Sequence, residues 1–362
     1  MRVLAVAGAS GGHIFPAIGF LDDFKSAYPD TQTLLVLPVR SIKKNIVFSG
    51  HPVRDISVST LSLRPSLANI KAALNFVKGF FESVGILSQF KPDIVVGFGS
   101  IASIPVVLCA WFFRTPVMIH EQNVLPGRAN RFLAHISDRI AVSFQDTAKF
   151  LSSNGSKSVW TGNVVRKSLA VIQKDKALEH FGLRQGKKTI LVMGGSQASR
   201  RINFGFASAF KVLSGRDQVQ VIHLCGEADK AELEKEYEAC ASSVRALPFL
   251  SEMQYAYSAA DLAVSRAGAT TIAELMAYRI PAILVPYPYA YAHQDANAQI
   301  LVEAGCAYKV PDARLLDGML HETLQTLMQG SSLGAMAAGY DRFAGMKPVS
   351  LVDEALKICR HG

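Results

Sequence analysis

A histidine follows a loop of small residues near the start of the sequence. The loop and the histidine, Gly8-Ala9-Ser10-Gly11-Gly12-His13, come after an alternating apolar stretch and before a helix predicted from about Phe15 to Ala27. Open α/β sheets bind ligands at the carboxyl ends of their strands, where this loop would lie. His13 is therefore a candidate residue of a ligand site; the alternative is a histidine that only caps the turn.

A second strand, glycine loop and helix begin near the middle of the sequence. The loop Gly194-Gly195-Ser196-Gln197-Ala198-Ser199 follows an apolar stretch, and a helix is predicted from about Arg201. The first N–H groups of a helix have no partner within the helix, and they lie at the positive end of its dipole. A glycine loop that leads into a helix is therefore suited to bind phosphate. Ser196 could add its hydroxyl and its N–H to such a site.

The last third of the sequence holds the densest group of candidate residues. A short strand breaks at Arg266-Ala267-Gly268-Ala269, and a helix is predicted from about Thr270 to Tyr278. Ala269 at this turn would offer an N–H group to an anion, and Glu274, one turn further along, could bind a sugar hydroxyl beside a phosphate. The pattern predicts a site for a nucleotide that carries a polyhydroxylated group. The alternative for Glu274 is a capping box with Thr271, in which the carboxylate satisfies only the helix's own N–H groups.

Four polar residues follow a further predicted strand. His120-Glu121-Gln122-Asn123 come directly after a β-branched stretch and could form a binding edge; ordinary loop polarity is the alternative. Two other polar segments are Gly162-Asn163-Val164-Val165-Arg166, which leads into a polar stretch, and His293-Gln294, at the end of an aromatic loop.

Repeated strand and helix units must position these residues. Such repeats predict the α/β class, with a parallel sheet covered by helices on both faces. The second strand, glycine loop and helix resemble the first, which indicates two similar halves. A polar stretch after Arg166 suits a boundary between them. We predict a first domain over residues 1–162, a second over 163–345, and a C-terminal helix within 346–362 that packs back toward the first domain.

Composition narrows the class of protein. A chain of 362 residues suggests two domains, and a formal net charge of +9 points to an acidic partner such as an anionic membrane surface or a phosphorylated substrate. We find no nucleic-acid-binding motif and expect no nucleic-acid partner. The longest apolar run, residues 101–113, is too short to span a bilayer. Five cysteines without a C-x-x-C pair, and an N-terminus that starts directly with a strand, favour a cytoplasmic protein with reduced thiols.

One predicted helix carries more apolar side chains than a single core-facing stripe needs. From residue 67 the spacing predicts a buried stripe of Leu67, Ile70, Leu74, Val77, Phe81 and Val84. Phe76 and Phe80 lie off this stripe, close to Lys71 and Lys78. They could dock at a membrane interface or cover a neighbouring loop.

Taken together, five motifs resemble one family and occur in its order over nearly the whole chain. They are GASGGHIFP at 8–16, HEQN at 120–123, GNVVR at 162–166, GGSQASRRIN at 194–203, and SRAGATTIAELM through HQDANA at 265–298. The family is the bacterial N-acetylglucosaminyltransferase of late peptidoglycan precursor synthesis. The resemblance implies a GT-B fold, with two Rossmann-like domains of parallel sheets that face each other across a cleft. It implies UDP-N-acetylglucosamine as donor and undecaprenyl-diphosphate-linked N-acetylmuramoyl pentapeptide as acceptor, at the inner face of the cell membrane.

The resemblance also assigns expected roles to residues. His13 would be the general base, and Glu274 would hold the uridine ribose hydroxyls. Arg166 and Ser196 would bind the diphosphate, beside the turn of Ala269 and Thr270. Leu250 would contact the uracil through its backbone. The remaining expected ligands contact the sugars: Ser10, Gly11, Gly12, Asn123, His293 and Gln294.

The implied reaction needs no cofactor and no metal ion. Helix N-termini and Arg166 could stabilise the departing diphosphate, and the sequence contains no D-x-D triplet that would hold a divalent ion. Displacement at the anomeric carbon would then invert its configuration.

Several segments depart from the family pattern, mostly in the half expected to bind the acceptor. They are Ala9-Ser10, the GFGS loop at 97–100, Ala198-Ser199, and the divergent residues 36–65. Two other hypotheses therefore stay open beside a transferase with a different lipid-linked acceptor. One is a UDP-N-acetylglucosamine 2-epimerase, and the other is a subunit that binds nucleotide sugar or membrane without catalysis.

Overall fold

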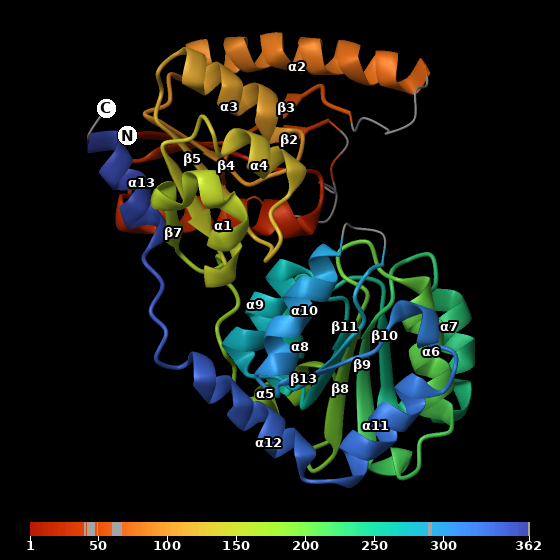
Figure 1. Cartoon of the computed structure of the whole chain (residues 1–362). Helices are drawn as coiled ribbons and strands as arrows, with labels where there is room; N and C mark the ends of the chain where they lie inside the picture. The colour runs from red at the N-terminus through yellow and green to blue at the C-terminus, as the bar shows by residue number, and fades with distance from the viewer. Residues whose placement is uncertain (40, 42–47, 49, 60–66, 289–291, 361–362) are drawn as a thin grey trace. The chain divides into compact units, whose positions relative to one another are not determined.

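The apolar strands of the sequence form two separate parallel sheets, one in each of two units (Figure 1). The computed structural model describes residues 1–39, 41, 48, 50–59, 67–288 and 292–360. Unit 1 comprises Met1–Lys167 with Lys347–Gly362, and unit 2 comprises Ser168–Met346. Of the divergent segment at 36–65, residues 40, 42–47, 49 and 60–65 lie outside the described residues.

Unit 1 is a Rossmann-like α/β unit whose described strands are all parallel. The sheet has the order β3-β2-β1-β4-β5-β6-β7. Its strands are β1 (Arg2–Val6), β2 (Gln32–Pro38), β3 (Val53–Ile56), β4 (Ile94–Gly97), β5 (Val117–Glu121), β6 (Arg139–Val142) and β7 (Ser158–Trp160). Its helices are α1 (Gly11–Ala27), α2 (Leu67–Phe90), α3 (Ser103–Phe112), α4 (Arg128–Leu133), the 3₁₀ segment η2 (Gln145–Lys157) and α13 (Leu351–Arg360).

Both faces of this sheet are buried, which explains why its strands are apolar at successive positions. Val3 and Ala5 face a core with Phe20 of α1 and Val352 of α13. Their neighbours along β1 face a second core, formed with α2, α3 and α4. Helix α13 therefore packs beside α1 on unit 1, although unit 2 separates them in the sequence (Figure 1).

Helix α2 buries a different face from the one predicted. Ile70, Leu74, Val77 and Phe81 of the predicted core stripe are 53–68% exposed and face outward, whereas Val84 packs against the core as predicted. The buried face carries small residues because the helix lies close to the chain before it. A Cβ on Gly79 would stand 2.5 Å from the carbonyl oxygen of Ser57.

The off-stripe aromatic residues of α2 lie against the protein rather than on its surface. Phe80 packs against the core of unit 1, and its carbonyl oxygen accepts from the thiol of Cys109 on α3. Phe76 is half-buried. No helix among the described residues is both long and apolar enough to cross a membrane.

Unit 2 repeats the Rossmann-like plan with one strand fewer among the described residues, in the order β10-β9-β8-β11-β12-β13. Its strands are β8 (Lys188–Met193), β9 (Val219–Leu224), β10 (Val244–Leu247), β11 (Leu262–Ser265), β12 (Ala282–Leu284) and β13 (Ala307–Lys309). Its α-helices are α5 (Lys174–His180), α6 (Arg200–Lys211), α7 (Lys230–Glu236), α8 (Met253–Ala259), α9 (Ala269–Tyr278), α10 (His293–Glu303), α11 (Met319–Gln329) and α12 (Ser332–Gly339). Its 3₁₀ segments are η3 (Arg216–Gln218), η4 (Glu238–Ser243), η5 (Asp312–Arg314) and η6 (Tyr340–Phe343).

The strand order reverses once in each sheet, and the glycine loops follow the strands at these points. In unit 1 the reversal lies between β1 and β4, and in unit 2 it lies between β8 and β11. Connections on the two sides of such a point leave toward opposite faces, so a crevice opens at the carboxyl edge. The loop before His13 and the GFGS loop share the crevice of unit 1. The loop with Ser196 and the Arg266 turn share that of unit 2.

Candidate functional site

His13 stands in the first turn of α1 rather than in the loop before it. The helix begins at Gly11, earlier than predicted, and Ser10 is its N-cap residue. The hydroxyl of Ser10 makes no capping bond to the helix. It lies instead 3.0 Å from Nδ1 of His13. His13 is half-buried, whereas Gly12 is exposed and Gly11 is buried.

The His13 ring lies between the two glycine loops at the strand-order reversal of unit 1. A Cβ on Gly8 would stand 2.9 Å from Nδ1, and a Cβ on Gly99 would stand 3.3 Å from Cδ2 and 3.4 Å from Nε2. Gly99 has φ of +83°. Any side chain at either glycine would therefore meet the imidazole.

Strand β5 continues through His120 and Glu121, which were predicted to follow it in a loop. His120 is fully buried, and its Nε2 lies 3.0 Å from the carbonyl oxygen of Gly162. Gln122 Nε2 lies 3.0 Å from Nδ1 of the same ring. Burial lowers the pKa of His120 to about 4, despite that carbonyl and the nearby Glu121. His120 is thus a neutral structural residue that holds the segment after β7.

The buried carboxylate of Glu121 organises the residues that follow β5. Its Oε1 accepts from the backbone N and the Nδ2 of Asn123, at 2.9 and 3.1 Å. Its Oε2 accepts from the backbone N of Gly127 and from Nδ2 of Asn130, at 2.9 and 2.8 Å. The predicted ligand Asn123 is therefore held in place by Glu121.

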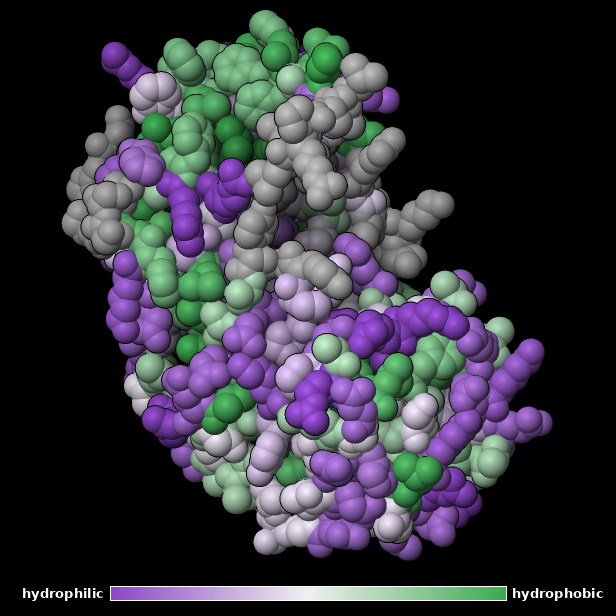
Figure 2. All heavy atoms as spheres, turned by 45° about the vertical axis from the view of Figure 1, so that its right-hand side comes forward, coloured by the Kyte–Doolittle hydropathy of each residue, from purple (hydrophilic) through white to green (hydrophobic). Residues whose placement is uncertain are grey.

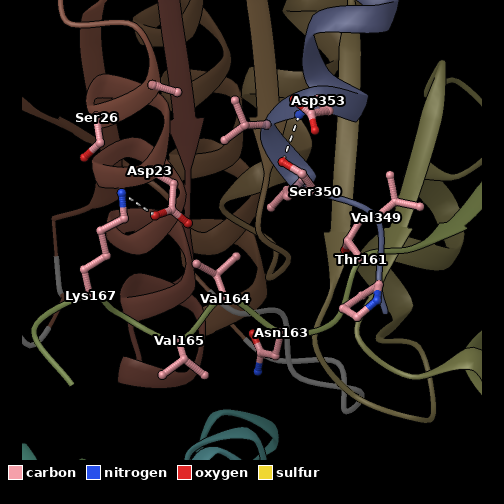
Figure 3. Close-up of a pocket in the computed structure, with 14 residues that line it drawn as sticks. Asp23, Ser26, Thr161, Asn163, Val164, Val165, Lys167, Val349, Ser350 and Asp353 are labelled. Carbon is pink, nitrogen blue, oxygen red and sulfur yellow. Dashed lines mark hydrogen bonds and ion pairs between the residues drawn. The ribbon is translucent and has the colours of Figure 1, made fainter. Parts of the chain in front are cut away.

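Arg166 and its neighbours lie along α1. The guanidinium of Arg166 stacks 4.1 Å from the ring centre of Phe15. The flanking residues line an open cavity of about 560 Å³ between α1 and the start of α13 (Figure 3). There Lys167 pairs with Asp23, and Ser350 accepts from the backbone N of Asp353. None of the predicted ligands lines this cavity.

In unit 2, Ser196 is exposed in the loop that leads from β8 into α6. Ser199 is the N-cap residue of α6, and its side chain accepts from the backbone N of Ile202. The same Oγ accepts from Nη2 of Arg266 at 2.8 Å. The loop after β8 is thus joined to the turn after β11, so both helix N-termini are held at one edge of the sheet.

Arg266, which was not predicted as a functional residue, connects four loops. Besides Ser199, its guanidinium donates to the carbonyl oxygen of Val285 at 3.2 Å, after β12. Its Nη1 also lies 2.6 Å from Oδ1 of Asp312, after β13, as an ion pair whose angles fall outside hydrogen-bond geometry. Asp312 pairs with Arg201 as well, so the cluster keeps an excess of positive charge. An arginine directly after a buried strand was the signal in the sequence.

Helix α9 begins at Ala269 with Gly268 as its N-cap and no side-chain cap. The capping box of Thr271 and Glu274 is therefore wrong, because Thr271 lies inside the helix. Ala269 and Thr270 form the helix start, whose first N–H groups have no partner within the helix. Glu274 is 7% exposed, and Tyr257 of α8 donates its hydroxyl to Oε2 at 2.5 Å.

The other predicted ligands of unit 2 lie on the same side of the sheet. Gln294 Oε1 accepts from the backbone N of Tyr287 at 2.9 Å and of Ala267 at 3.2 Å, so it joins two loops. His293 is the first residue of α10. Leu250 is half-buried in the segment between β10 and α8.

A buried polar chain behind α6 was also missed from the sequence. Asn203 donates to Asp229 and to the carbonyl oxygen of Cys225, both at 2.8 Å. Its Oδ1 must therefore accept from Nε2 of His223, 3.1 Å away. His223 Nδ1 then accepts from the hydroxyl of Tyr237 at 2.9 Å. The chain fixes the first turn of α6, and no motif predicts it because its members are far apart in sequence.

Among the described residues, no group of three His, Cys, Asp or Glu side chains is arranged to hold a metal ion. The polar groups at the carboxyl edge of unit 2 are helix N–H groups, one buried guanidinium, a carboxylate and amides. They can bind an anion beside hydroxyl groups. The edge of unit 1 presents an imidazole beside two glycine loops, which suits proton transfer.

Curated relatives resemble the chain over nearly its whole length. The chain is 34% identical over 366 residues to the UDP-N-acetylglucosamine–N-acetylmuramyl-(pentapeptide) pyrophosphoryl-undecaprenol N-acetylglucosamine transferase of Thermodesulfovibrio yellowstonii, covering 99% of both. It is 35% identical to the enzyme of that name from Bacillus subtilis, covering 91% of both.

Solved structures share the fold. The crystal structure of MurG from Acinetobacter baumannii matches with a TM-score of 0.75 and 25% identity, covering 98% of this chain and 99% of that one. A UDP-N-acetylglucosamine 2-epimerase matches with a TM-score of 0.63 at 15% identity, covering 94% of this chain and 90% of that one, which shows the fold alone. The two Rossmann-like units are those of the GT-B class.

Models of protein families match most of the chain. The glycosyltransferase family 28 N-terminal domain matches residues 3–142, and the family 28 C-terminal domain matches residues 189–345. These two matches fall in unit 1 and unit 2 respectively. The chain belongs to glycosyltransferase family 28.

Proposed function

We propose that this protein transfers N-acetylglucosamine from UDP-N-acetylglucosamine to the N-acetylmuramoyl pentapeptide carried by undecaprenyl diphosphate, with inversion to a β-1,4 linkage. The observation that carries the proposal is 34% identity over 99% of the chain to a relative whose name states this donor and acceptor. The product would be the disaccharide precursor of peptidoglycan.

Unit 2 would bind the donor. Glu274 would accept from the ribose hydroxyls, in an orientation set by the Tyr257 hydroxyl. Ser196 and the N-termini of α6 and α9 would hold the diphosphate, because helix N–H groups and the dipole favour an anion there. The backbone at Leu250 would contact the uracil, and the amide N–H groups of Gln294 would donate to sugar hydroxyls beside His293.

Fixed positive charge would stabilise the departing UDP. Arg166 would add its guanidinium to the diphosphate, because its fork of charged N–H donors matches the geometry of phosphate oxygens. Arg266 would contribute indirectly, because its hydrogen bond to Ser199 fixes the N-terminus of α6. Groups fixed before the reaction begins need no reorganisation as charge develops on the leaving oxygen.

Unit 1 would bind the acceptor and supply the base. His13 would take the proton from the 4-hydroxyl of the N-acetylmuramoyl group as that oxygen attacks the anomeric carbon. The bond from this carbon to the β-phosphate oxygen breaks, and its electron pair leaves with UDP. Asn123 and the loop of Ser10, Gly11 and Gly12 would line the sugar side of this reaction.

We further propose that the protein acts on the inner face of the cell membrane, at an anionic lipid surface. Ile70, Leu74, Val77 and Phe81 form an exposed apolar face on α2, and Trp111, Phe112 and Phe113 at the end of α3 are also exposed. Figure 2 shows hydrophobic residues gathered over the α2 end of unit 1. Lys71, Lys78 and Arg114 are exposed beside these side chains. Apolar groups flanked by lysine and arginine suit an anionic membrane interface.

The experiment is an assay with UDP-N-acetylglucosamine and the lipid-linked pentapeptide in detergent. The wild type should form the disaccharide lipid. His13→Ala should lower kcat by about 100-fold or more with little change in donor affinity, since general bases contribute roughly that much. Glu274→Ala should weaken donor binding measured by calorimetry.

Controls separate the other hypotheses. Asp217→Ala in η3, exposed at the amino end of β9 and thus at the opposite edge of the sheet from the predicted ligands, should leave both quantities unchanged. Consumption of the donor without any acceptor would favour an epimerase. Donor binding with no product from any acceptor would indicate a binding subunit, and full turnover by His13→Ala would remove His13 as the base.

A further inference from the structure

We propose that Ser10 is a positioning residue for His13. Its hydroxyl would hold Nδ1 of the imidazole, so that Nε2 is the nitrogen that receives the proton. This inference rests on the proposed function, in which His13 is the base. It differs from the expected role of Ser10 as a contact to the sugar.

The first observation is that the Ser10 hydroxyl contacts the His13 ring and not the backbone of the helix. A serine at an N-cap commonly accepts from a backbone N–H of the helix it starts. Ser10 makes no such bond, and its Oγ lies 3.0 Å from Nδ1 of His13. The backbone oxygen of Ser10 accepts from His13 N and Ile14 N at 3.1 Å each, so these two N–H groups do not need the hydroxyl.

The second step is the confinement of the ring. Gly8 and Gly99 approach it so closely that neither could carry a Cβ without touching it. The Gly99 loop is itself fixed, because Ser103 donates its hydroxyl to the carbonyl oxygen of Gly99 at 2.6 Å. Two loops from neighbouring strands therefore hold the ring, and the hydroxyl faces one ring nitrogen only.

The third step is the position of the proton. A neutral imidazole carries one N–H donor and one acceptor nitrogen. When Nδ1–H donates to the Ser10 oxygen, the lone pair lies on Nε2, which can take a proton from the acceptor hydroxyl. The other tautomer carries its proton on Nε2 and cannot do so. A serine hydroxyl can accept from Nδ1–H or donate to a bare Nδ1, so the contact by itself fits both tautomers. Acceptance by Ser10 is the reactive direction, because the imidazolium that forms must donate from Nδ1 and the hydroxyl then needs no reorientation.

In the reaction the acceptor O–H bond breaks and its proton forms a bond to Nε2. The acceptor oxygen forms a bond to the anomeric carbon, and UDP leaves with the electron pair of the broken bond. Throughout, Nδ1–H stays on the Ser10 oxygen and stabilises the imidazolium that forms.

The test compares Ser10→Ala, Ser10→Thr and Ser26→Ala. The last removes a hydroxyl at the other end of α1, where it donates to the carbonyl oxygen of Asp22. Ser10→Ala should lower kcat by about 3- to 10-fold with unchanged affinity for UDP-N-acetylglucosamine. Ser10→Thr keeps the hydroxyl and should restore kcat, and Ser26→Ala should match the wild type.

Nitrogen-15 NMR of histidine-labelled protein reports the tautomer directly, with the His13 signal assigned by its loss in His13→Ala. The wild type should carry the proton on Nδ1, and Ser10→Ala should show a mixture. A wild-type proton on Nε2, or a loss of donor affinity with kcat unchanged in Ser10→Ala, would overturn the inference.

The two proposals fail in different ways. If the wild type makes no disaccharide lipid, the proposed function fails, while the NMR pattern still decides whether Ser10 orients His13. If the wild type is active and Ser10→Ala turns over equally fast, only the role of Ser10 fails.

Discussion

Tyr257 and Glu274 form a buried pair within unit 2. The carboxylate accepts from a phenol at 2.5 Å, and neither residue is more than 7% exposed. A hydrogen bond to a charged group contributes about 1.5–3 kcal/mol. The Tyr257 phenol therefore fixes the orientation in which Glu274 would contact the ribose. Tyr257 lies outside the sequence motifs quoted above.

Tyr257→Phe should weaken UDP-N-acetylglucosamine binding by about tenfold, because the carboxylate loses the donor that orients it. Tyr278→Phe is the matched control. Its ring packs at a tilt against that of Tyr257, with 5.1 Å between the ring centres, but its hydroxyl donates to the carbonyl oxygen of Ala170. Calorimetric titration of both variants checks this, and equal affinities in the two would contradict the role of Tyr257.

His223 links stability to pH. Burial lowers its pKa from 6.5 to about 3, against the nearby Asp229. The unfolded chain takes up a proton as the pH falls through about 6.5, whereas the folded histidine stays neutral until about pH 3. The free energy of unfolding should therefore fall by about 2 kcal/mol for this residue between pH 7.5 and pH 5.

Urea denaturation at the two pH values measures this loss. His223→Asn should remove the contribution of one histidine, although it also lowers stability at pH 7.5 by breaking the chain to Asn203. His135→Asn, at an exposed site on unit 1, should leave the pH dependence of the wild type unchanged. An identical pH slope in the wild type and His223→Asn would refute the prediction.

At the residue scale, the sequence pointed to candidate ligands but not to the residues that hold them in place. Glycine loops and helix starts are local patterns, so Ser196 and Thr270 could be proposed from their neighbours. Arg266 contacts Ser199, which lies 67 residues earlier, and the two meet only because β8 and β11 are adjacent in the sheet. Such partners follow from the strand order, which no single motif encodes.

At the scale of elements, the loops at the strand-order reversals lie so close to neighbouring side chains that they restrict the positions of those side chains. Gly99 combines a φ of +83° with contacts to the His13 ring and to Nδ2 of Asn130, each about 3.4 Å from an added Cβ. Gly215, before η3, has a φ of +74° with nothing within 4 Å. A comparison of these two glycines therefore distinguishes the cost of a left-handed backbone from the effect of a collision with the imidazole.

Gly99→Ala and Gly215→Ala should each lower the free energy of unfolding by about 1–2 kcal/mol, the cost of a left-handed residue with a side chain. Only Gly99→Ala should also lower kcat, by about tenfold or more, because the added methyl group displaces the His13 ring. Denaturation and the transferase assay check the two effects. A kcat for Gly99→Ala equal to that of Gly215→Ala would contradict the confinement of His13.

The periodicity of apolar residues predicted which segments are strands and which are helices. It did not predict where strand β5 ends or which face of helix α2 is buried. Strand β5 extends to Glu121 because polar side chains at its end find buried partners in Gly162, Gln122 and Asn130. On α2, the large apolar residues suggested the core face. The helix buries Ala72, Ser83 and Leu87 instead, together with Gly79, where only a residue without a side chain allows the helix to approach residue 57 so closely. Hydrophobicity alone does not distinguish a core from a surface that binds lipid.

At the scale of the whole molecule, the exposed face of α2 should govern membrane binding. Leu74→Ser with Phe81→Ser should lower binding to phosphatidylcholine vesicles that contain phosphatidylglycerol by about tenfold, because less apolar area leaves water. Binding of the wild type should also weaken as salt rises. Sedimentation with the vesicles measures both effects.

The control is an equally exposed apolar pair in unit 2, Val212→Ser with Leu316→Ser. This pair should bind vesicles like the wild type. If it loses as much binding as the α2 variant, or if the α2 variant binds normally, the α2 face is not the membrane contact. Transferase activity toward a water-soluble acceptor analogue should remain in all of these proteins.

The two parallel sheets and their glycine loops could be predicted because each unit repeats one strand, loop and helix pattern. The position where the units divide depends on packing. Residues 163–167 lie along α1, where Val164 contacts Gly19 and Lys167 pairs with Asp23, so unit 1 extends through Lys167. Sequence composition indicated a boundary after Gly162. It could not show that residues 163–167 pack on α1, because side-chain contacts of this kind leave no pattern in the sequence.

The return of α13 to unit 1 has a consequence for synthesis. Leu351, Val352 and Ala355 complete the core beneath α1, yet the ribosome makes them after all of unit 2. Unit 1 therefore cannot complete this core until α13 has left the ribosome, after all of unit 2 has been made.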